Sequence, residues 1–445
     1  MSDLPLAPVE STQVIQDRII DPYLRDNISI GLIASHNLRL PPVKEISGID
    51  REFVFQFPQI PDYVDLRNIQ LYVKGSIRKS EKDEKLAFVF NDASVTDSAM
   101  VTNNALHSLF ESVMILVGTN QEKIFETNRP QKAFIRQMMN METVNSADLK
   151  SQGFDEDIKK DKGDYESMLT KAGWYNGSNQ IEFCGPTLLD FCQTQGYLPP
   201  NTPMQIMYRM APAQQYLVVK KEDADNLRNA RFKIDEICLF VPIMKLNPAL
   251  APYMQSLTDK SPARYRFESL ECRQHTIGSD IQHKVLNRVY NGKIPTRFLL
   301  AFYDQSSLLG ELSSNNLFTS TDVVVEYIRI YVNGSLVREI ETDFENNLYR
   351  LAHRSCLDWF EAKHKNHVLR YENYKSGYTY FAVDLMEGCD EGRCTPNLLQ
   401  SGFVDIEVKF QKKLDEPAIL MCFGISPDTL DIDDKGSCRL TRTVQ

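Results

Sequence analysis

The sequence predicts an all-β protein built from two tandem eight-stranded jelly-roll sandwiches with short helices and long inserted loops. Short segments such as residues 63–77 alternate apolar and polar side chains, which is the pattern of a half-buried strand. Aromatic residues, which favour strands, are plentiful at 23 Phe and 19 Tyr. A strand–turn–strand pattern recurs in both halves of the chain. Halves of about 200 residues suit jelly rolls with inserted loops better than the shorter immunoglobulin-type sandwich.

The composition is that of an ordinary globular protein. The 445 residues are 42% hydrophobic and 25% charged, enough apolar material for a large core in two or three domains. The net charge of −10 argues against a surface that wraps nucleic acid. Nine cysteines are an odd and sparse set, which favours a reducing compartment. Residues 1–16 lack a signal-peptide pattern and no apolar stretch reaches membrane-spanning length, so we expect an intracellular protein.

The chain is expected to begin with an N-terminal arm over residues 1–45, which is polar, interrupted by prolines and without periodicity. Alternating segments then predict strands at 52–57 and 63–77. A charged turn at 79–85 and a short strand at 86–90 follow.

A helical turn is predicted at residues 103–110, with Asn103 or Asn104 as its N-cap. Strands at 112–117 and 122–125 follow, and a Gly-Thr-Asn turn joins them into a hairpin.

Residues 128–141 predict a helix, because a proline near its start is tolerated in the first turn. The polar and charged residues 142–173 are expected to form a long surface insertion. Strands at 204–210 and 232–244 complete the first jelly roll, which we assign to residues 46–250.

A proline-containing connector at residues 251–264 separates the two halves. The second half starts again with strands at 265–276, 296–304 and 323–332. An Asn333-Gly334 pair between alternating runs then predicts a tight hairpin, because both residues accept positive φ.

The second jelly roll is assigned to residues 265–425, and the polar residues 426–445 are expected to form an extended C-terminal tail. Its last predicted strands are 378–385, 403–410 and 418–425.

An internal duplication supports two similar domains. Residues 113–136 and 328–351 share the order strand, turn, strand, Glu-Thr and a helical stretch with an aromatic residue. At a constant offset the matched pairs are Val117 with Val332, Glu126 with Glu341, Thr127 with Thr342, and Phe134 with Tyr349.

No catalytic residue, cofactor site or metal site is predicted. His364, His367, Cys389 and Cys394 come nearest to a zinc site, but their spacing fits no standard pattern and a charged, lysine-rich loop is the simpler interpretation. The HxH pair of cupin-type sandwiches, the glycine-rich phosphate loop, GxSxG and HExxH are all absent.

The remaining candidates have simpler structural interpretations. His107 lies between apolar residues and is interpreted as a core or cap histidine. Trp174 and Tyr175 suit either a sugar-stacking platform or, more simply, a loop anchor. Acidic residues in 155–164 alternate with lysines, as in a solvated loop, and residues 431–434 (DIDD) lack the glycine and spacing of a calcium loop.

Six stretches taken together resemble one protein family. They are DYVDLRNIQLYVKGSI (62–77), NNALHSLFESVMILVG (103–118), FKIDEICLFVPIMKLNPAL (232–250), DFENNLYRLAHRS (343–355), ENYKSGYTYFAVDL (372–385) and SGFVDIEVKFQKKLDEPAILMCFG (401–424). In amino-acid sequence and in order they are similar to the hexon-like major capsid proteins of the Polinton (Maverick) and adintovirus group, over residues 45–432.

The resemblance implies a double jelly-roll fold, a pseudo-hexagonal homotrimer, and trimers that tile an icosahedral capsid. The partners it implies are further copies of the chain and the penton and minor capsid proteins of the same virus, with no specific nucleic-acid sequence. The implied location is the virion capsid, assembled in the reducing cytoplasm or nucleus of the host cell. We expect the arm 1–45 and the tail 426–445 to lie on the inner side of the shell and to order on assembly.

Three other functions stay open at this point. A tandem β-sandwich that binds glycans or a receptor on a viral surface would use Trp174, Tyr175 and nearby loops. A glycan-cleaving enzyme on a jelly roll would need facing carboxylates. A penton-type minor capsid protein is usually a single jelly roll, so the length and the duplication favour the major capsid protein.

Overall fold

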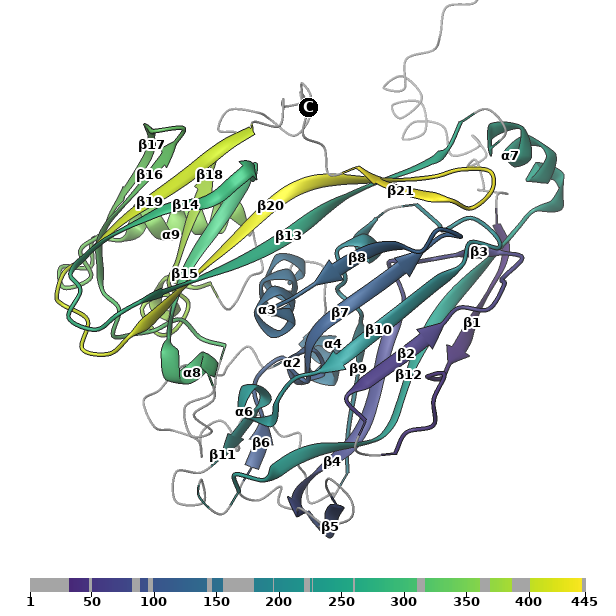
Figure 1. The fold of residues 1–445 in the computed structure, drawn as a ribbon, viewed down its shortest axis with the longest axis horizontal. Helices are drawn as coiled ribbons and strands as arrows, with labels where there is room; N and C mark the ends of the chain where they lie inside the picture. The colour runs from purple at the N-terminus through teal and green to yellow at the C-terminus, as the bar shows by residue number, and fades with distance from the viewer. Residues whose placement is uncertain are drawn as a thin grey trace, which may run out of the picture.

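The computed structural model describes residues 32–47, 50–81, 89–94, 99–141, 146–154, 180–194, 196–219, 225, 227–258, 261–309, 317–360, 369–385 and 401–441. Antiparallel strands dominate these residues and form two sandwiches, one from each half of the chain (Figure 1). The predicted all-β class is therefore confirmed.

The first sandwich consists of a six-stranded and a four-stranded sheet. The larger sheet has the order β1 (Leu32–Leu40), β12 (Ala230–Leu246), β4 (Gln70–Glu81), β5 (Val89–Ser94), with β3 (Tyr63–Val64) on β12 and β9 (Ile181–Pro186) on β4. The smaller sheet has the order β2 (Glu52–Gln56), β10 (Met204–Met210), β7 (Phe110–Val117), β8 (Glu122–Glu126). A separate pair joins β6 (Ala99–Val101) to β11 (Leu217–Val219).

The second sandwich has a five-stranded and a four-stranded sheet. The larger has the order β13 (Ala263–Ile277), β20 (Ala418–Ile432), β15 (Arg297–Asp304), β18 (Tyr380–Asp384), with β21 (Cys438–Thr441) on β20. The smaller has the order β14 (His283–Lys293), β19 (Ser401–Phe410), β16 (Val325–Val332), β17 (Ser335–Glu341).

The two sandwiches have the same topology. The order β1-β12-β4-β9 in one larger sheet is repeated as β13-β20-β15-β18 in the other, strand by strand in the same chain order. The order β2-β10-β7-β8 is repeated in the same way as β14-β19-β16-β17. Each module is thus an eight-stranded jelly roll, and the duplication predicted from sequence is confirmed by the strand pairing.

Short helices lie between the strands. They are α2 (Ala105–Ser108), α3 (Arg129–Asn140), α4 (Ser146–Ser151), α6 (Ala213–Tyr216), α7 (Ala251–Thr258), α8 (Gln305–Leu309), α9 (Arg350–Trp359) and α10 (Tyr371–Tyr374), with 3₁₀ turns η1 (Phe191–Gln193) and η3 (Pro248–Leu250).

The duplication ends at the helix that follows each hairpin. β8 ends at Glu126 and α3 begins at Arg129, whereas β17 ends at Glu341 and α9 begins only at Arg350. The predicted match of Phe134 with Tyr349 is therefore wrong, because Tyr349 is the N-cap of α9 while Phe134 lies within α3. Asn104 is the N-cap of α2 as expected, but its side chain makes no capping hydrogen bond.

Both predicted terminal segments contain strands. Residues 32–40, assigned to the N-terminal arm, pair with β12 as β1. In the predicted tail, β20 continues to Ile432 and β21 returns along it. These segments lack a strong pattern of their own, and pairing with a long neighbouring strand decides their conformation. The domain boundaries drawn from sequence stay predictions.

Three other details differ from the sequence-based expectation. The strand predicted at 63–77 is interrupted, because the Asp65 carboxylate accepts hydrogen bonds from the Arg67 backbone N–H and the Asn68 amide. The predicted connector contains the helix α7. The strand β14 was not predicted, because many of its side chains are exposed and its pairing with β19 is irregular.

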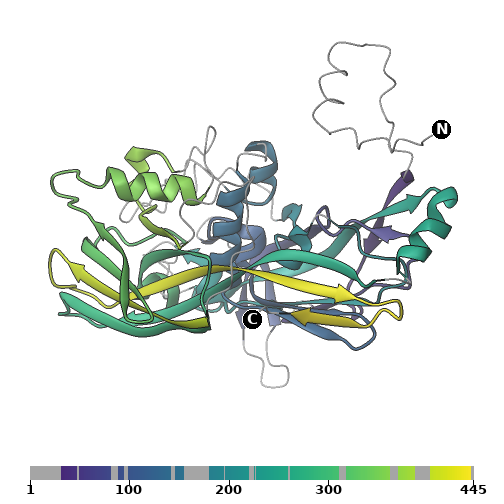
Figure 2. The same cartoon turned by 90° about the horizontal axis from the view of Figure 1, so that it is seen from above.

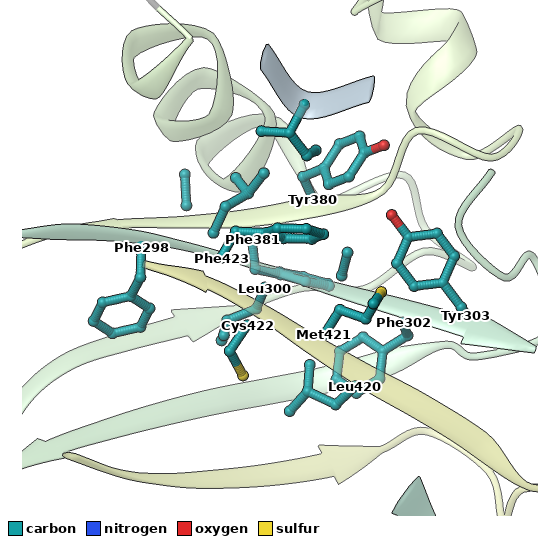
Figure 3. Close-up of a cluster of buried hydrophobic side chains, with 14 of the residues drawn as sticks. Phe298, Leu300, Phe302, Tyr303, Tyr380, Phe381, Leu420, Met421, Cys422 and Phe423 are labelled. Carbon is teal, nitrogen blue, oxygen red and sulfur yellow. The ribbon is translucent and has the colours of Figure 1, made fainter. Parts of the chain in front are cut away.

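The two hydrophobic cores interlock. Figure 3 shows the core of the second module, where side chains from β15, β18 and β20 meet. Phe134 and Ile135 of α3, a helix of the first module, belong to this same core. In the other direction, Tyr265 and Phe267 of β13 and Leu430 of β20 belong to the core of the first module. Neither module therefore completes its core alone.

The Asn333-Gly334 turn provides a test of the hairpin. Asn333 and Gly334 have φ values of 51° and 82°. At the second of these positions only glycine adopts the positive φ without strain. We expect Gly334→Ala to lower the free energy of unfolding by about 1–2 kcal/mol, because an L side chain costs that much in the left-handed region. Urea unfolding measures it.

Gly278→Ala is the matched control. A Cβ at Gly278 would lie 3.7 Å from the nearest atom, Cδ1 of Ile281, and Gly278 does not have a positive φ. This variant should change stability by no more than about 0.5 kcal/mol. Equal losses in both variants would contradict the assignment of the cost to backbone conformation.

Candidate functional site at the junction of the two modules

The junction forms where the free edge of β13 lies against the first module. η1 of the first module places the Phe191 ring edge-on to Tyr265 and Phe267, with centroid separations of 6.3 and 5.6 Å. The Tyr265 hydroxyl donates a hydrogen bond of 2.7 Å to the Tyr197 carbonyl. These aromatic contacts provide the apolar part of the junction.

Asp190 is the centre of the polar part. Its carboxylate accepts hydrogen bonds from Lys132 Nζ at 3.1 Å and from Arg136 Nη2 at 3.0 Å, both on α3. It also accepts the backbone N–H of Leu270 on β13 at 2.8 Å. Arg136 Nη2 donates as well to the Glu268 carbonyl at 2.6 Å. Side chains of the first module thus form hydrogen bonds with backbone groups on the outer edge of β13.

A second carboxylate supports the first. Glu126 at the end of β8 accepts the Asp190 backbone N–H at 2.7 Å and pairs with Arg129 Nη1 at 3.1 Å. Arg129 is almost fully buried, donates to the Leu188 carbonyl at 2.9 Å, and also donates to the Thr187 carbonyl. The charges of α3 are therefore held between β8, η1 and β13.

The electrostatics of this cluster favour charged pairs. Burial of the Asp190 carboxyl opposes its ionisation, but Lys132 and Arg136 outweigh burial and hold its pKa below the ordinary value. Burial and the nearby Arg129 guanidinium lower the pKa of His107 well below its usual range. His107 Nδ1 lies 3.4 Å from Arg129 Nη2, and the ring is fully buried, which agrees with the predicted core histidine.

A second contact ties the end of the chain to the first module. The tip of the β7–β8 hairpin bonds to the β20–β21 turn, where Thr119 N–H donates to the Gly436 carbonyl at 2.8 Å. The Asn120 amide donates to the Cys438 carbonyl at 2.6 Å and accepts its N–H at 2.9 Å. Gly118 is needed here, because a Cβ would lie 2.5 Å from Cys438 Sγ.

Two cavities flank the exposed Phe125 at the junction, with volumes of about 280 and 340 Å³. The lysines that line the smaller one are already paired, Lys132 with Asp190 and Lys293 with Asp428, the latter at 2.6 Å. The cations around this cavity therefore neutralise carboxylates of the protein itself.

Several candidates from sequence lie outside the described residues. These are His364, His367, Cys389, Cys394, Trp174, Tyr175 and the run 155–164. Within the DIDD segment, Asp431 pairs with Arg264, and Asp433 accepts the N–H groups of Lys435 and Ser437 in a turn. These two acids thus have structural partners.

The ranges that the structure describes hold no group of three or more His, Cys, Asp and Glu side chains placed to bind a metal ion, and no helix long and apolar enough to cross a membrane. Seven of the nine cysteines fall in these ranges, and all seven are free thiols.

The junction residues were not predicted from sequence. The signal was present in α3, whose arginines and lysine are spaced along a helix that also carries Phe134, Ile135 and Met138. A helix with cations on the same buried surface as large apolar residues needs buried carboxylates nearby. Nothing in the local sequence identifies Asp190, 54 residues from Arg136, as the partner.

The fold matches solved virus structures over nearly the whole chain. The cryo-EM structure of the Sputnik virophage matches with a TM-score of 0.60 and 10% identity, covering 98% of this chain and 93% of that chain. The PBCV-1 virus capsid matches with a TM-score of 0.58 and 9% identity, covering 95% of this chain and 100% of that chain. The mavirus major capsid protein matches with a TM-score of 0.53 and 10% identity, covering 99% of this chain and 95% of that chain.

No protein-family model matches the chain, and no curated protein sequence matches it. The likeness to the solved structures is therefore one of fold. The chain has the double jelly-roll fold expected from its sequence, and the matches extend over both modules.

Replacing Asp190 tests the junction. Asp190→Asn leaves Lys132 and Arg136 buried beside a neutral side chain, and we expect the free energy of unfolding at pH 7 to fall by about 3–5 kcal/mol. Asp431→Asn, which breaks the surface pair with Arg264, should cost no more than about 1 kcal/mol. Urea unfolding of both variants gives the comparison.

The pH dependence of the Asp190 effect has a defined sign. A carboxyl with a lowered folded-state pKa contributes stability above its unfolded pKa, near 3.9, and loses it as the pH falls through the folded value. The difference between the wild type and Asp190→Asn should therefore be full at pH 7 and shrink below about pH 4. A difference independent of pH would contradict this charge pairing.

Proposed function

We propose that this chain is a structural, non-enzymatic major capsid protein whose trimers form hexon-like capsomers of an icosahedral viral shell. The observation that carries the proposal is the pair of topologically equivalent jelly rolls joined in one chain, in the fold of virus capsid structures over at least 95% of its length. A penton-type minor capsid protein, usually a single jelly roll, fits this architecture less well.

The junction supports a role as a rigid building block. The two modules share cores and a buried charge cluster, so one chain presents two similar sandwiches in a fixed relation. Three such chains supply six similar sandwiches, which suits a pseudo-hexagonal capsomer. The proposed partners are further copies of the chain and the penton and minor capsid proteins of the same virus. Assembly in a reducing compartment of the host cell agrees with the free thiols at the seven described cysteines.

The oligomeric mass tests this function. Light scattering coupled to size exclusion should give a mass three times that of the 51.1 kDa chain, and electron microscopy should then find shells or hexagonal particles. A chain that stays a monomer of 51.1 kDa at high concentration would contradict the proposed trimer.

The N-terminal segment gives a second test. We expect deletion of residues 1–31 to leave the trimer mass unchanged, because β1 begins only at Leu32. We expect the same deletion to reduce the yield of closed shells, because we propose that this segment lies on the inner side of the shell. Electron microscopy of assembly reactions measures the yield. Unchanged shell yield would show that the segment has no part in closure.

A further inference from the structure

The outward face of the smaller sheet differs between the two modules at one cross-strand row. At the constant offset of the duplication, Met114 on β7 matches Arg329 on β16. Figure 2 shows the two modules side by side, with α3 and α9 on the same side of the strands, so the rows through these two positions can be compared. The row of the first module is Val54, Met207, Met114 and Phe125, and that of the second is Val285, Glu407, Arg329 and Glu339.

The row of the second module is ionic, whereas that of the first is apolar. Arg329 Nε donates to Glu339 Oε1 at 2.6 Å, and its Nη1 lies 3.8 Å from Glu407 Oε1. The equivalent pair in the first module is Met114 with Phe125, and the Phe125 side chain is 55% exposed. The jelly-roll topology therefore accepts a charged residue at this position. The aromatic ring is a feature of the first module alone.

Phe125 forms part of the wall of the larger junction cavity, which has a volume of about 340 Å³. This volume lies within the range of small-molecule sites. The walls come from β7, β8, β10, α3 and α6 of the first module and from β13 and α8 of the second, which meet where the two modules join (Figure 1). The cavity is therefore a product of the two-module chain.

Four carboxamides line the same cavity, from Asn128, Gln131, Gln215 and Gln274. Asn128 is the N-cap of α3, a position where Asn side chains commonly accept a backbone N–H of the first turn, yet it makes no capping hydrogen bond. Its Oδ1 instead accepts Gln274 Nε2 of the second module at 2.8 Å. This bond fixes both carboxamides, and each retains hydrogen-bonding capacity, at Asn128 Nδ2 and at Gln274 Oε1.

The charged groups at this cavity neutralise each other. Among the described residues that line it, Arg209 and Glu111 carry the charges, and Arg209 Nε lies 2.8 Å from Glu111 Oε1. Glu52 lies 4.0 Å from the same Nε. An anionic ligand would have to compete with these carboxylates for the guanidinium. A metal ion would find one carboxylate, which is already paired, where calcium takes six or more oxygen ligands. The lining therefore favours a neutral ligand with hydroxyl groups.

We propose that this cavity binds a neutral carbohydrate, with the Phe125 ring against the C–H face of a sugar ring. Sugar hydroxyls both donate and accept hydrogen bonds, as carboxamides do, and the C–H face of the ring is apolar. The cavity combines partners for both, an aromatic ring and four carboxamides. The inference goes beyond the proposed capsid function and does not depend on it. The site is also distinct from Trp174 and Tyr175, which lie outside the described residues.

Saturation-transfer NMR with the purified full-length protein tests the site. The probes are the methyl glycosides of glucose, galactose, mannose, N-acetylglucosamine and N-acetylgalactosamine. We expect at least one of them to receive saturation and to bind with a dissociation constant in the millimolar range. Phe125→Ala should raise that constant about 10-fold, because it removes the aromatic wall.

Two further variants control for folding and for nonspecific contact. Phe125→Glu introduces the residue type that the second module has at the equivalent position, and we expect it to fold and to lose binding. Tyr253→Ala removes a ring that is 61% exposed on α7 and does not line the cavity, so it should bind as the wild type does. Thermal unfolding checks that all variants fold.

The proposal is wrong if none of the five glycosides receives saturation, or if folded Phe125→Ala binds as tightly as the wild type. Binding of sialyllactose without binding of any neutral glycoside would also overturn it, because the lining offers its cation to an internal carboxylate. A chain that assembles but binds no glycoside contradicts this inference alone. A chain that binds a glycoside but stays a monomer contradicts only the proposed capsid function.

Discussion

A buried cluster of charges between the two jelly rolls is the interaction on which the rest of the structure depends. Transfer of Asp190, Arg136 and Lys132 out of water costs several kcal/mol for each ion, and only close pairing and hydrogen bonding offset that cost. The cluster meets this requirement by using backbone groups of β13 as additional partners. Its geometry can therefore form only when the two modules are in their correct relative positions, so it selects one arrangement.

The apolar contacts act in the same direction. Because α3 contributes Phe134 to the core of the second module, and β13 contributes Tyr265 and Phe267 to the core of the first, separating the modules would expose apolar surface on both sides. The additional contact between the β7–β8 tip and the β20–β21 turn joins residues 318 positions apart. A two-module chain stabilised in this way suits a role in which shape, rather than chemistry, is the function.

The treatment of strand edges distinguishes the two modules. Jelly rolls leave edge strands, and an uncovered edge invites pairing with other chains. η1 and α3 cover the edge of β13, while no described strand other than β12 pairs with β1. The two equivalent jelly rolls thus differ in how the described residues cover the edge of their first strand.

The sequence alone determined the fold class, the duplication and most strands, because alternation, aromatic content and turn residues such as Asn333-Gly334 act locally. The position of the β16–β17 hairpin and the helix after β8 were predicted for the same reason. Tertiary structure alone decided that residues 32–40, 426–432 and 438–441 form strands, since they pair with β12, β13 and β20, respectively. It also decided that Asp190 meets Arg136 and the edge of β13, a contact between residues far apart in the chain, and such contacts leave no periodic signal in a single sequence.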